Sequence, residues 1–189
     1  MEDFVLKEAK QGNEFAFARI VETYEKRIYQ LCYRMVGTPE DAADQTQETF
    51  LKAWRGLAAF QGDCSIGTWL YRLAANCCID HLRREKKHRT HLKQWDGGEE
   101  DQPRPDPADP SPGPQETLEQ KERQEAVWSA MKRLTPEHRM ILILRETQGL
   151  SYSEIAEVLG LEEGTVKSRL ARARLQLRNT LKNQGTFLR

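Results

Sequence analysis

Apolar side chains recur every three or four positions along most of this chain, which is the spacing of a buried helix face. The first run lies between Asn13, a residue type that caps helix starts, and Gly37, a residue type that ends helices. Its apolar positions are Phe17, Ile20, Val21, Tyr24, Ile28, Leu31, Cys32 and Met35. This pattern predicts one long helix that is buried along one side.

Two more helices are predicted in the first half of the chain. Thr38 supplies a cap and Pro39 occupies the first helical position, a combination typical of a helix start. We expect this helix to end near Leu57. After a break at residues 61–63, another helical pattern runs from about 68 to 89 and becomes strongly basic at its end.

The second half also has helical patterns, and no alternating strand pattern of useful length appears. Ser151 and Glu154 are spaced as a capping box, in which a hydroxyl and a carboxylate satisfy free backbone N–H groups. The helix that they start is short and ends at Gly160. The predicted helices cover about 115–133, 135–149, 151–160, and 163 to beyond 178. The predicted fold class is therefore all-α.

A proline-rich, acidic segment separates the two sets of helices. Six of the eight prolines fall between Pro103 and Pro114. Proline lacks a backbone N–H and disfavours helix in the residue before it, and neighbouring acids repel one another. Residues 96–114 are therefore expected to form an extended, unpacked linker. The predicted organisation is two small helical domains, residues 1–95 and 115–189, on either side of it.

The formal net charge of zero conceals an uneven distribution. Residues 1–95 carry 15 basic and 13 acidic side chains, residues 96–125 carry 3 and 10, and residues 126–189 carry 11 and 6. The basic C-terminal domain can attract phosphate, and the acidic middle segment cannot. Without a signal sequence or an apolar run of roughly 18 residues, we expect a cytoplasmic chain with no direct membrane insertion and with reduced cysteines.

The two helical segments on either side of Gly160 have the order of a helix-turn-helix, whose second helix enters the major groove of DNA. A rotation of roughly 100° per residue gives this second helix a buried stripe at Val166, Leu170, Ala173 and Leu177. Its opposite side carries Lys167, Ser168, Ala171, Arg172, Leu175 and Arg178. Long cations there can reach phosphates or guanine edges, and small side chains permit close approach. The alternative is a solvated basic face on an ordinary packing helix.

Three segments resemble the extracytoplasmic-function group of bacterial RNA polymerase sigma factors. Gly149-Leu-Ser-Tyr-Ser-Glu154, continuing through Gly164-Thr-Val-Lys-Ser-Arg169, resembles the promoter-reading end of that family. Residues 41–55 resemble its polymerase-docking helix, and residues 60–84 resemble its strand-opening segment. The order of these matches implies a sigma factor with region 2 and region 4 domains, which directs RNA polymerase to promoters and is not an enzyme.

The resemblance also implies roles for individual residues. Those implied to bind the polymerase are Asp44, Gln47 and Glu48. Those implied to bind the −10 element are Phe60, Trp69, Arg72, Asn76, Arg83 and Arg84. Those implied to bind the −35 element are Lys167, Ser168, Arg169, Ala171, Arg172, Arg174 and Arg178. Rings such as Phe60 and Trp69 can stack on unpaired bases, but an ordinary place in the core is an equally open reading of them.

Partners follow from the same resemblance. Core RNA polymerase is expected to contact the chain through the clamp helices of its largest subunit and the flap of its second-largest subunit. The other expected partners are promoter DNA and an anti-sigma factor, which would hold the chain at the inner face of the membrane. The acidic linker would mimic nucleic acid inside the polymerase cleft, and a plain flexible tether explains its composition equally well. No cofactor is implied.

Two other functions fit parts of this sequence. A stand-alone helix-turn-helix regulator normally dimerises to read two half-sites, and this sequence has neither a heptad seam nor a ligand domain. A metalloprotein could use Cys77, Cys78, His81, His88 and His91, but adjacent cysteines do not easily face one metal from a helix. No catalytic residues are assigned, because no nucleophile-and-base set or glycine-rich phosphate loop is present.

Overall fold

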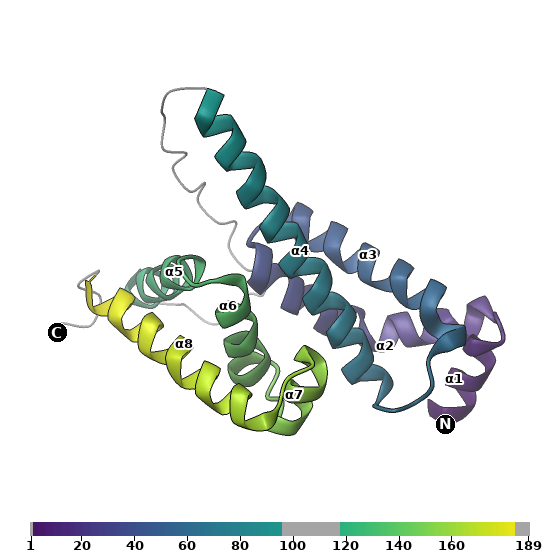
Figure 1. Ribbon diagram of the computed structural model, residues 1–189. Coiled ribbons are helices and arrows are strands. Elements are labelled where there is room, and N and C mark those ends of the chain that lie inside the picture. The colour runs from purple at the N-terminus through teal and green to yellow at the C-terminus, as the bar shows by residue number, and fades with distance from the viewer. Residues whose placement is uncertain (1, 96–117, 184–189) are drawn as a thin grey trace.

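The computed structural model describes the backbone of residues 2–95 and 118–183, and the side chains of residues 4–88 and 123–183. All regular elements in these ranges are helices, which confirms the predicted all-α class. They form two domains, α1–α4 and α5–α8 (Figure 1). None of the described helices is both long enough and apolar enough to cross a membrane. The predicted linker, residues 96–114, lies outside the described residues.

The N-terminal domain is built around α2 (Glu14–Val36), which packs against α1, α3 and α4. The predicted cap is confirmed, because the Asn13 side chain accepts a hydrogen bond from the Ala16 N–H. Gly37 ends the helix with φ of 94°, a left-handed conformation that favours glycine. The predicted apolar face is buried at Ile20, Ile28, Leu31, Cys32 and Met35.

Three other helices complete this domain: α1 (Glu2–Lys10), α3 (Pro39–Gly56) and α4 (Ile66–Trp95), with a 3-10 turn, η1 (Leu57–Ala59), after α3. The α3 start is as predicted, since Thr38 Oγ1 accepts a hydrogen bond from the Asp41 N–H at 3.2 Å. The sequence pattern did not predict α1. Its apolar residues Phe4, Val5 and Leu6 are exposed or half-buried, so the helix lacks a strong periodic signal.

The C-terminal domain consists of α5 (Leu118–Lys132), α6 (Pro136–Leu142), a π-helical turn, η2 (Ile143–Thr147), α7 (Tyr152–Leu159) and α8 (Glu163–Asn183). The predicted single helix over 135–149 is therefore α6 followed by η2. In this turn the Gln148 N–H donates to the Ile143 carbonyl, five residues back, at 3.1 Å. The predicted capping box is present, with both reciprocal bonds between Ser151 and Glu154.

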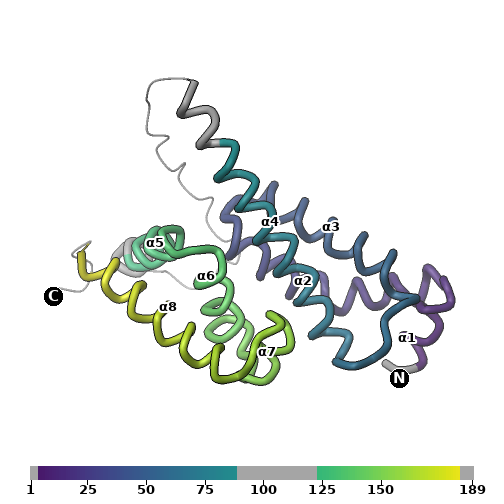
Figure 2. Tube along the Cα trace, viewed as in Figure 1, coloured from purple at the N-terminus to yellow at the C-terminus, as the bar shows by residue number. Residues whose placement is uncertain are grey.

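The two domains pack against one another. Helix α4 lies against α6 and α7, and α2 contacts α6 and η2. Figure 2 shows α4 passing beside the C-terminal domain in the same view as Figure 1. Most of the buried apolar residues of both domains belong to one continuous cluster. This packing was not predicted from the sequence.

Candidate nucleic-acid interface

Helix α8 has the two-sided character that the sequence predicts. Val166, Leu170 and Ala173 are almost completely buried, and Leu177 packs against the same core. On the other side, the exposed residues are Lys167, Ser168, Ala171, Arg172, Leu175 and Arg178. A face that combines long cations with small side chains can approach the edges of bases and reach phosphates on either side.

The turn before α8 orients it against α7. The Ser151–Glu154 capping box begins α7, and Gly160 ends it with φ of 63°. The pKa of Glu154 is lowered because the Ser151 N–H and then the Ser151 hydroxyl donate to its carboxylate. Only Leu161 and Glu162 separate Gly160 from α8, so the two helices meet closely, as in a helix-turn-helix.

Tyr152, at the start of α7, is a residue that sequence reasoning missed. Its ring lies 5.7 Å from the Lys167 Nζ and 4.9 Å from the Arg145 guanidinium carbon. Lys167 also pairs with Glu163 at 3.3 Å, four residues earlier on α8. Two neighbours thus orient the Lys167 ammonium near the start of α8. An aromatic residue directly after the capping serine was the available sequence signal.

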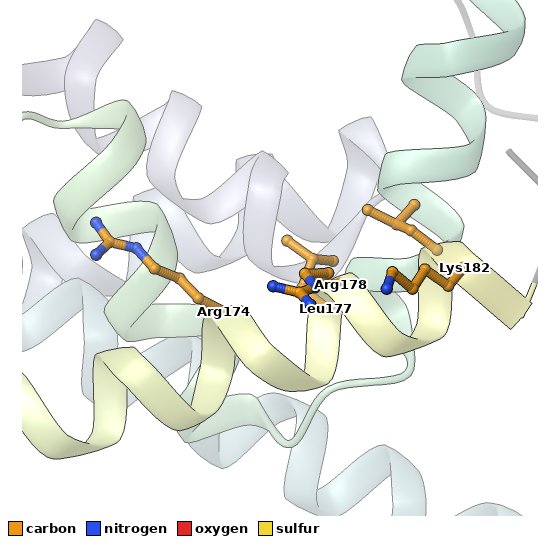
Figure 3. A pocket seen from close by; sticks show the side chains of 5 residues that line it. Arg174, Leu177, Arg178 and Lys182 are labelled. Carbon is orange, nitrogen blue, oxygen red and sulfur yellow. The ribbon is translucent and has the colours of Figure 1, made fainter. Parts of the chain in front are cut away.

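Three further cations of α8 that are predicted to bind the −35 element, Arg169, Arg174 and Arg178, differ in their surroundings. Arg174 forms an ion pair with Glu146 of η2, with Nη2 and Nε at 2.5 and 3.1 Å from the same carboxylate oxygen. The hydrogen bond that Arg174 donates to Glu146 raises the pKa of Arg174. Arg169 is half-buried, and Arg178 is exposed. A shallow hollow of about 250 Å³ follows this end of α8, lined by Arg174, Leu177, Arg178, Leu181 and Lys182 (Figure 3).

Phe60 and Trp69, the rings predicted to stack on bases, lie together near the start of α4. Their centroids are 4.9 Å apart, with 31° between the ring planes. Phe60 is only 7% exposed, and the Lys10 ammonium donates to its carbonyl at 2.6 Å and lies over its ring. Trp69 is half-buried. In this conformation Phe60 is packed as a core residue, and Trp69 presents part of its ring.

The polar residues predicted to bind the −10 element all project from α4. Asn76 and Arg84 are exposed. Arg72 instead donates two hydrogen bonds to the Glu157 carbonyl of α7, from Nε at 3.1 Å and Nη2 at 2.8 Å. Arg83 pairs with Glu137 of α6 at 2.9 Å. Two of these four residues are thus engaged by the C-terminal domain.

The predicted polymerase-binding residues share one face of α3. Asp44 and Gln47 are exposed, and Glu48 pairs with Lys52 at 3.4 Å. Leu51, 41% exposed, continues the same face one turn further on. A groove of about 440 Å³ runs between this face and α2, with Val21, Glu25, Tyr29, Ala43, Thr46, Gln47, Phe50 and Leu51 around it. A partner surface that is basic and partly apolar would fit these residues.

The side chains considered for a metal site are not brought together. The Cys77 thiol lies 3.4 Å from the Lys52 ammonium, and Cys78 is buried against Cys32, whose hydrogen bond to it lowers the pKa of Cys32 and raises that of Cys78. His81 Nδ1 is 3.4 Å from the Gln45 amide. Across residues 4–88 and 123–183, no three potential metal-binding side chains cluster. His91 lies outside the described side chains.

Comparison with known protein families matches each domain separately. Residues 20–88 match the family described as Sigma-70 region 2, and residues 124–177 match Sigma-70, region 4. The ECF RNA polymerase sigma factor SigW of Bacillus subtilis is 33% identical over 178 residues, 94% of this chain and 95% of the relative. The ECF RNA polymerase sigma factor SigM of Mycobacterium tuberculosis is 35% identical, over 90% of this chain and 79% of the relative.

Solved structures have the same architecture. The structure of CnrH in complex with the cytosolic domain of CnrY matches with a TM-score of 0.66 and 27% identity, over 95% of this chain and 96% of CnrH. The sigma factor RpoE from Bartonella quintana, in complex with the anti-sigma factor NepR, matches with a TM-score of 0.64 over 88% of this chain and 96% of its own length. Its 23% identity supports the fold alone.

Proposed function

Because this chain belongs to the extracytoplasmic-function group of bacterial RNA polymerase sigma factors, we propose that its two domains divide promoter recognition between them. Such a protein is a transcription initiation factor and not an enzyme, and its partners are RNA polymerase and promoter DNA. We assign residues 1–95 to polymerase docking and the −10 element, and residues 115–189 to the −35 element. Residues 96–114 join the two domains.

The C-terminal domain reads the −35 element through α8. The observation that carries this proposal is the exposed face of α8, where Lys167, Ser168, Ala171 and Arg172 lie opposite a buried apolar stripe. Arg172 can make a bidentate contact to guanine, and Lys167 is already oriented by Tyr152. Arg169, Arg174 and Arg178 bind the flanking phosphates and fix the register of the helix on the duplex.

The N-terminal domain captures the unpaired strand of the −10 element along α4. Trp69, Arg72, Asn76, Arg83 and Arg84 supply a partly exposed ring and polar donors along this helix. Stacking of a base on an aromatic ring contributes roughly 1–3 kcal/mol, and cations bind the phosphates beside it. The Phe60 ring packs against Trp69. This ring becomes available to a base only if Phe60 leaves its packed position.

The exposed face of α3 is the docking surface for core polymerase. Asp44, Gln47 and Glu48 bind the clamp helices of the largest subunit, and the C-terminal domain binds the flap of the second-largest subunit. Charge complementarity supports the first contact, because exposed acids suit a basic partner. Both CnrH and the Bartonella quintana RpoE have structures with a bound partner, CnrY and the anti-sigma factor NepR respectively. We propose that an anti-sigma factor likewise holds this chain, in the cytoplasm or at the inner face of the membrane.

Reconstituted transcription tests the proposal. Core RNA polymerase with and without this chain is given a library of templates whose upstream 50 or so base pairs are randomised, and the transcribed templates are sequenced. The expected result is chain-dependent transcription with two enriched elements at a fixed separation. Chain-bound polymerase that enriches only one element would contradict the division between the domains.

A further inference from the structure

Lys10, in the last turn of α1, lies beside the rings that we assign to the −10 element. Its ammonium donates a hydrogen bond to the Phe60 carbonyl at 2.6 Å and lies over the Phe60 ring, 5.9 Å from its centroid. Trp69 packs against the same ring, with 4.9 Å between the two ring centroids. A cation of α1 is therefore part of the surface around this aromatic pair.

The backbone around Lys10 is anchored to the neighbouring elements. Helix α1 packs against α2 and η1 (Figure 1), and Ala9, directly before Lys10, is only 2% exposed. The Asn13 N–H donates to the Glu8 carbonyl at 3.2 Å, and the Asn13 side-chain amide donates to the Glu8 carboxylate at 3.1 Å. These bonds join the end of α1 to the start of α2, so Lys10 projects from a fixed position.

The Phe60 carbonyl is a favourable acceptor for this cation. Phe60 closes η1, because its N–H donates to the Leu57 carbonyl at 3.1 Å. Carbonyls at the end of a helical segment lack a partner within it and carry partial negative charge. Since Lys10 binds the main chain of Phe60, the hydrogen bond does not depend on the orientation of the ring. The ring can turn toward a base while Lys10 keeps its place.

The loop that follows Phe60 is held at its other end as well. The Ser65 hydroxyl accepts a hydrogen bond from the Thr68 N–H at 3.0 Å and caps the start of α4, directly before Trp69. Lys10 and Ser65 therefore hold the backbone on the two sides of the loop that brings Phe60 and Trp69 together.

Lys10 also keeps hydrogen-bond donors for a further acceptor. An ammonium has three N–H groups, and the Phe60 carbonyl is the one acceptor that Lys10 binds among the residues with described side chains. Lys10 is half-buried, so part of its side chain reaches solvent. Proteins that bind single strands combine aromatic rings for the bases with cations for the phosphates. Lys10 and the rings of Phe60 and Trp69 have this combination.

We propose that Lys10 is a DNA contact of the −10 site, which binds a phosphate of the unpaired strand beside the base that stacks on Phe60 and Trp69. The inference deepens the proposed function and rests on it, because it takes these two rings as −10 contacts. One N–H group of Lys10 positions the cation on the Phe60 carbonyl, and the others bind the phosphodiester. Lys10 lies 50 residues before Phe60, outside the segment 60–84 that the sequence indicated.

The first test measures how binding depends on salt. Polymerase complexes are assembled with the parent chain or a variant, and each is titrated with a fluorescent single-stranded 15-mer that carries the −10 element of a template selected by the library. One phosphate contact on a single strand changes the slope of log affinity against log salt by about 0.7. Lys10→Met should therefore bind more weakly, and its deficit relative to the parent should shrink about 2.6-fold between 50 and 200 mM salt.

Two variants of α1 are matched controls for this measurement. Lys10→Arg keeps the charge and the donors, and it should keep the slope of the parent. Lys7→Met removes a charge from an exposed position of the same helix and should also keep that slope. Circular dichroism and core binding show whether each variant remains folded and assembled.

The second test locates the phosphate on the strand itself. Single linkages of the 15-mer are replaced in turn by uncharged methylphosphonates. With the parent, a methylphosphonate at the contacted linkage should weaken binding about as much as Lys10→Met does. In the Lys10→Met complex the same linkage should have little further effect, because the interaction is already lost. A strand in which no linkage shows this coupling overturns the phosphate contact.

The outcomes separate this inference from the −10 assignment. Trp69→Ala and Asn76→Ala complexes that bind the 15-mer as tightly as the parent would show that the −10 assignment is wrong. If these variants weaken binding but Lys10→Met keeps the slope of the parent, the −10 assignment stands and the Lys10 contact is wrong. A Lys10→Met complex that binds more weakly with an unchanged slope means that Lys10 only positions Phe60, which also overturns the phosphate contact.

Discussion

Arg172 and Arg178 project from the same exposed side of α8, but they are expected to bind different parts of DNA. A side chain that reads a base changes the preference at one position, and one that binds phosphate weakens all sequences alike. Arg172→Ala should cost about 1–3 kcal/mol at its preferred base pair and relax selection there. Arg178→Ala should lower binding uniformly and reduce the salt dependence. The measurement is the randomised template library, transcribed with each variant at several salt concentrations.

Each variant serves as the control for the other, because both remove one arginine from one helix face. The assignment of Arg172 as a base reader is wrong if Arg172→Ala lowers output evenly across the library. The assignment of Arg178 is wrong if its replacement changes the preference at a single position.

Arg174 leads to a different expectation, because Glu146 already binds its guanidinium. An exposed ion pair contributes only about 0–1 kcal/mol to stability, so Glu146→Ala should leave the unfolding midpoint nearly unchanged. It should free Arg174 for phosphate, strengthen non-specific duplex binding and steepen the salt dependence by about one charge. Titration of a random duplex at several salt concentrations measures this. Glu146→Ala combined with Arg174→Ala should return to the weaker binding; a double variant that keeps the gain would implicate another cation.

At the scale of single residues, local periodicity predicted which side of α8 is buried, because Val166, Leu170 and Ala173 recur with the helical repeat. Local periodicity did not predict the partners of individual polar groups. Glu146 and Arg174 are 28 residues apart, and Gln45 and His81 are 36 apart. The sequence around each of these residues does not indicate that the fold brings the two members of a pair together.

Among the elements, α7 depends on its capping box. The contribution of this box to stability should therefore change with pH. The bonds from Ser151 lower the pKa of Glu154 in the folded chain below its ordinary value of 4.5. The stabilisation is therefore full above about pH 4.5 and is lost as the pH falls through the lower, folded-state pKa. At pH 7, Glu154→Ala should lower the free energy of unfolding by about 1 kcal/mol. Denaturant unfolding from pH 7 down to pH 4 should show this difference beginning to shrink near the acid end.

Glu157→Ala is the matched control for the capping box, since it removes an exposed glutamate from the same helix and leaves the bonds between Ser151 and Glu154 in place. A Glu154→Ala effect that stays constant to the lowest pH at which the chain is folded would mean that the carboxylate does not act as a charged cap.

Helix α3 should fail as a docking element when its charge is reversed. Asp44→Lys with Glu48→Lys replaces two acids on the exposed face by cations, which a basic polymerase surface repels. We expect core binding, measured by pull-down or by fluorescence anisotropy, to be abolished. Glu14→Lys with Glu22→Lys makes the same change of charge on exposed positions of α2 and should retain binding. Core binding that survives the α3 reversal would refute the docking assignment.

Most helix boundaries could be predicted because they depend on neighbours in the sequence. Asn13, Thr38 and Ser151 each accept a hydrogen bond from an N–H three residues ahead, so a short motif contains the whole interaction. The π-helical turn η2 could not be predicted in this way. Its residues Ile143 and Leu144 are buried between elements from both domains, and tertiary packing sets their backbone form.

For the whole molecule, the sequence indicated two domains and their order but not their contact. Arg139 falls within the helix predicted over 135–149, yet its hydrogen bond to the Met35 carbonyl joins positions 104 residues apart. The sequence predicts an extended linker between the domains, and such a linker does not indicate which surfaces of the domains meet. The sequence also does not indicate that Arg72 is engaged, because its hydrogen bond to the Glu157 carbonyl forms only through this packing.

The size of the folded chain leads to the last prediction. The names of the −35 and −10 elements give their positions, which are about 25 base pairs apart. This separation is about 85 Å along B-DNA at roughly 3.4 Å per base pair. A compact chain of 189 residues has a radius of gyration of about 16 Å, so a chain whose two domains pack together cannot reach both elements. The free chain should therefore bind a duplex with both elements within about twofold of a duplex with the −35 element alone.

The polymerase complex, in which the domains are held apart, should prefer the duplex with both elements by at least about tenfold, equivalent to roughly 1.4 kcal/mol. Anisotropy titrations of the two duplexes, taken from a template that the library selects, measure both ratios at one salt concentration. A parent chain that alone discriminates tenfold would show that its domains separate and reach both elements without polymerase.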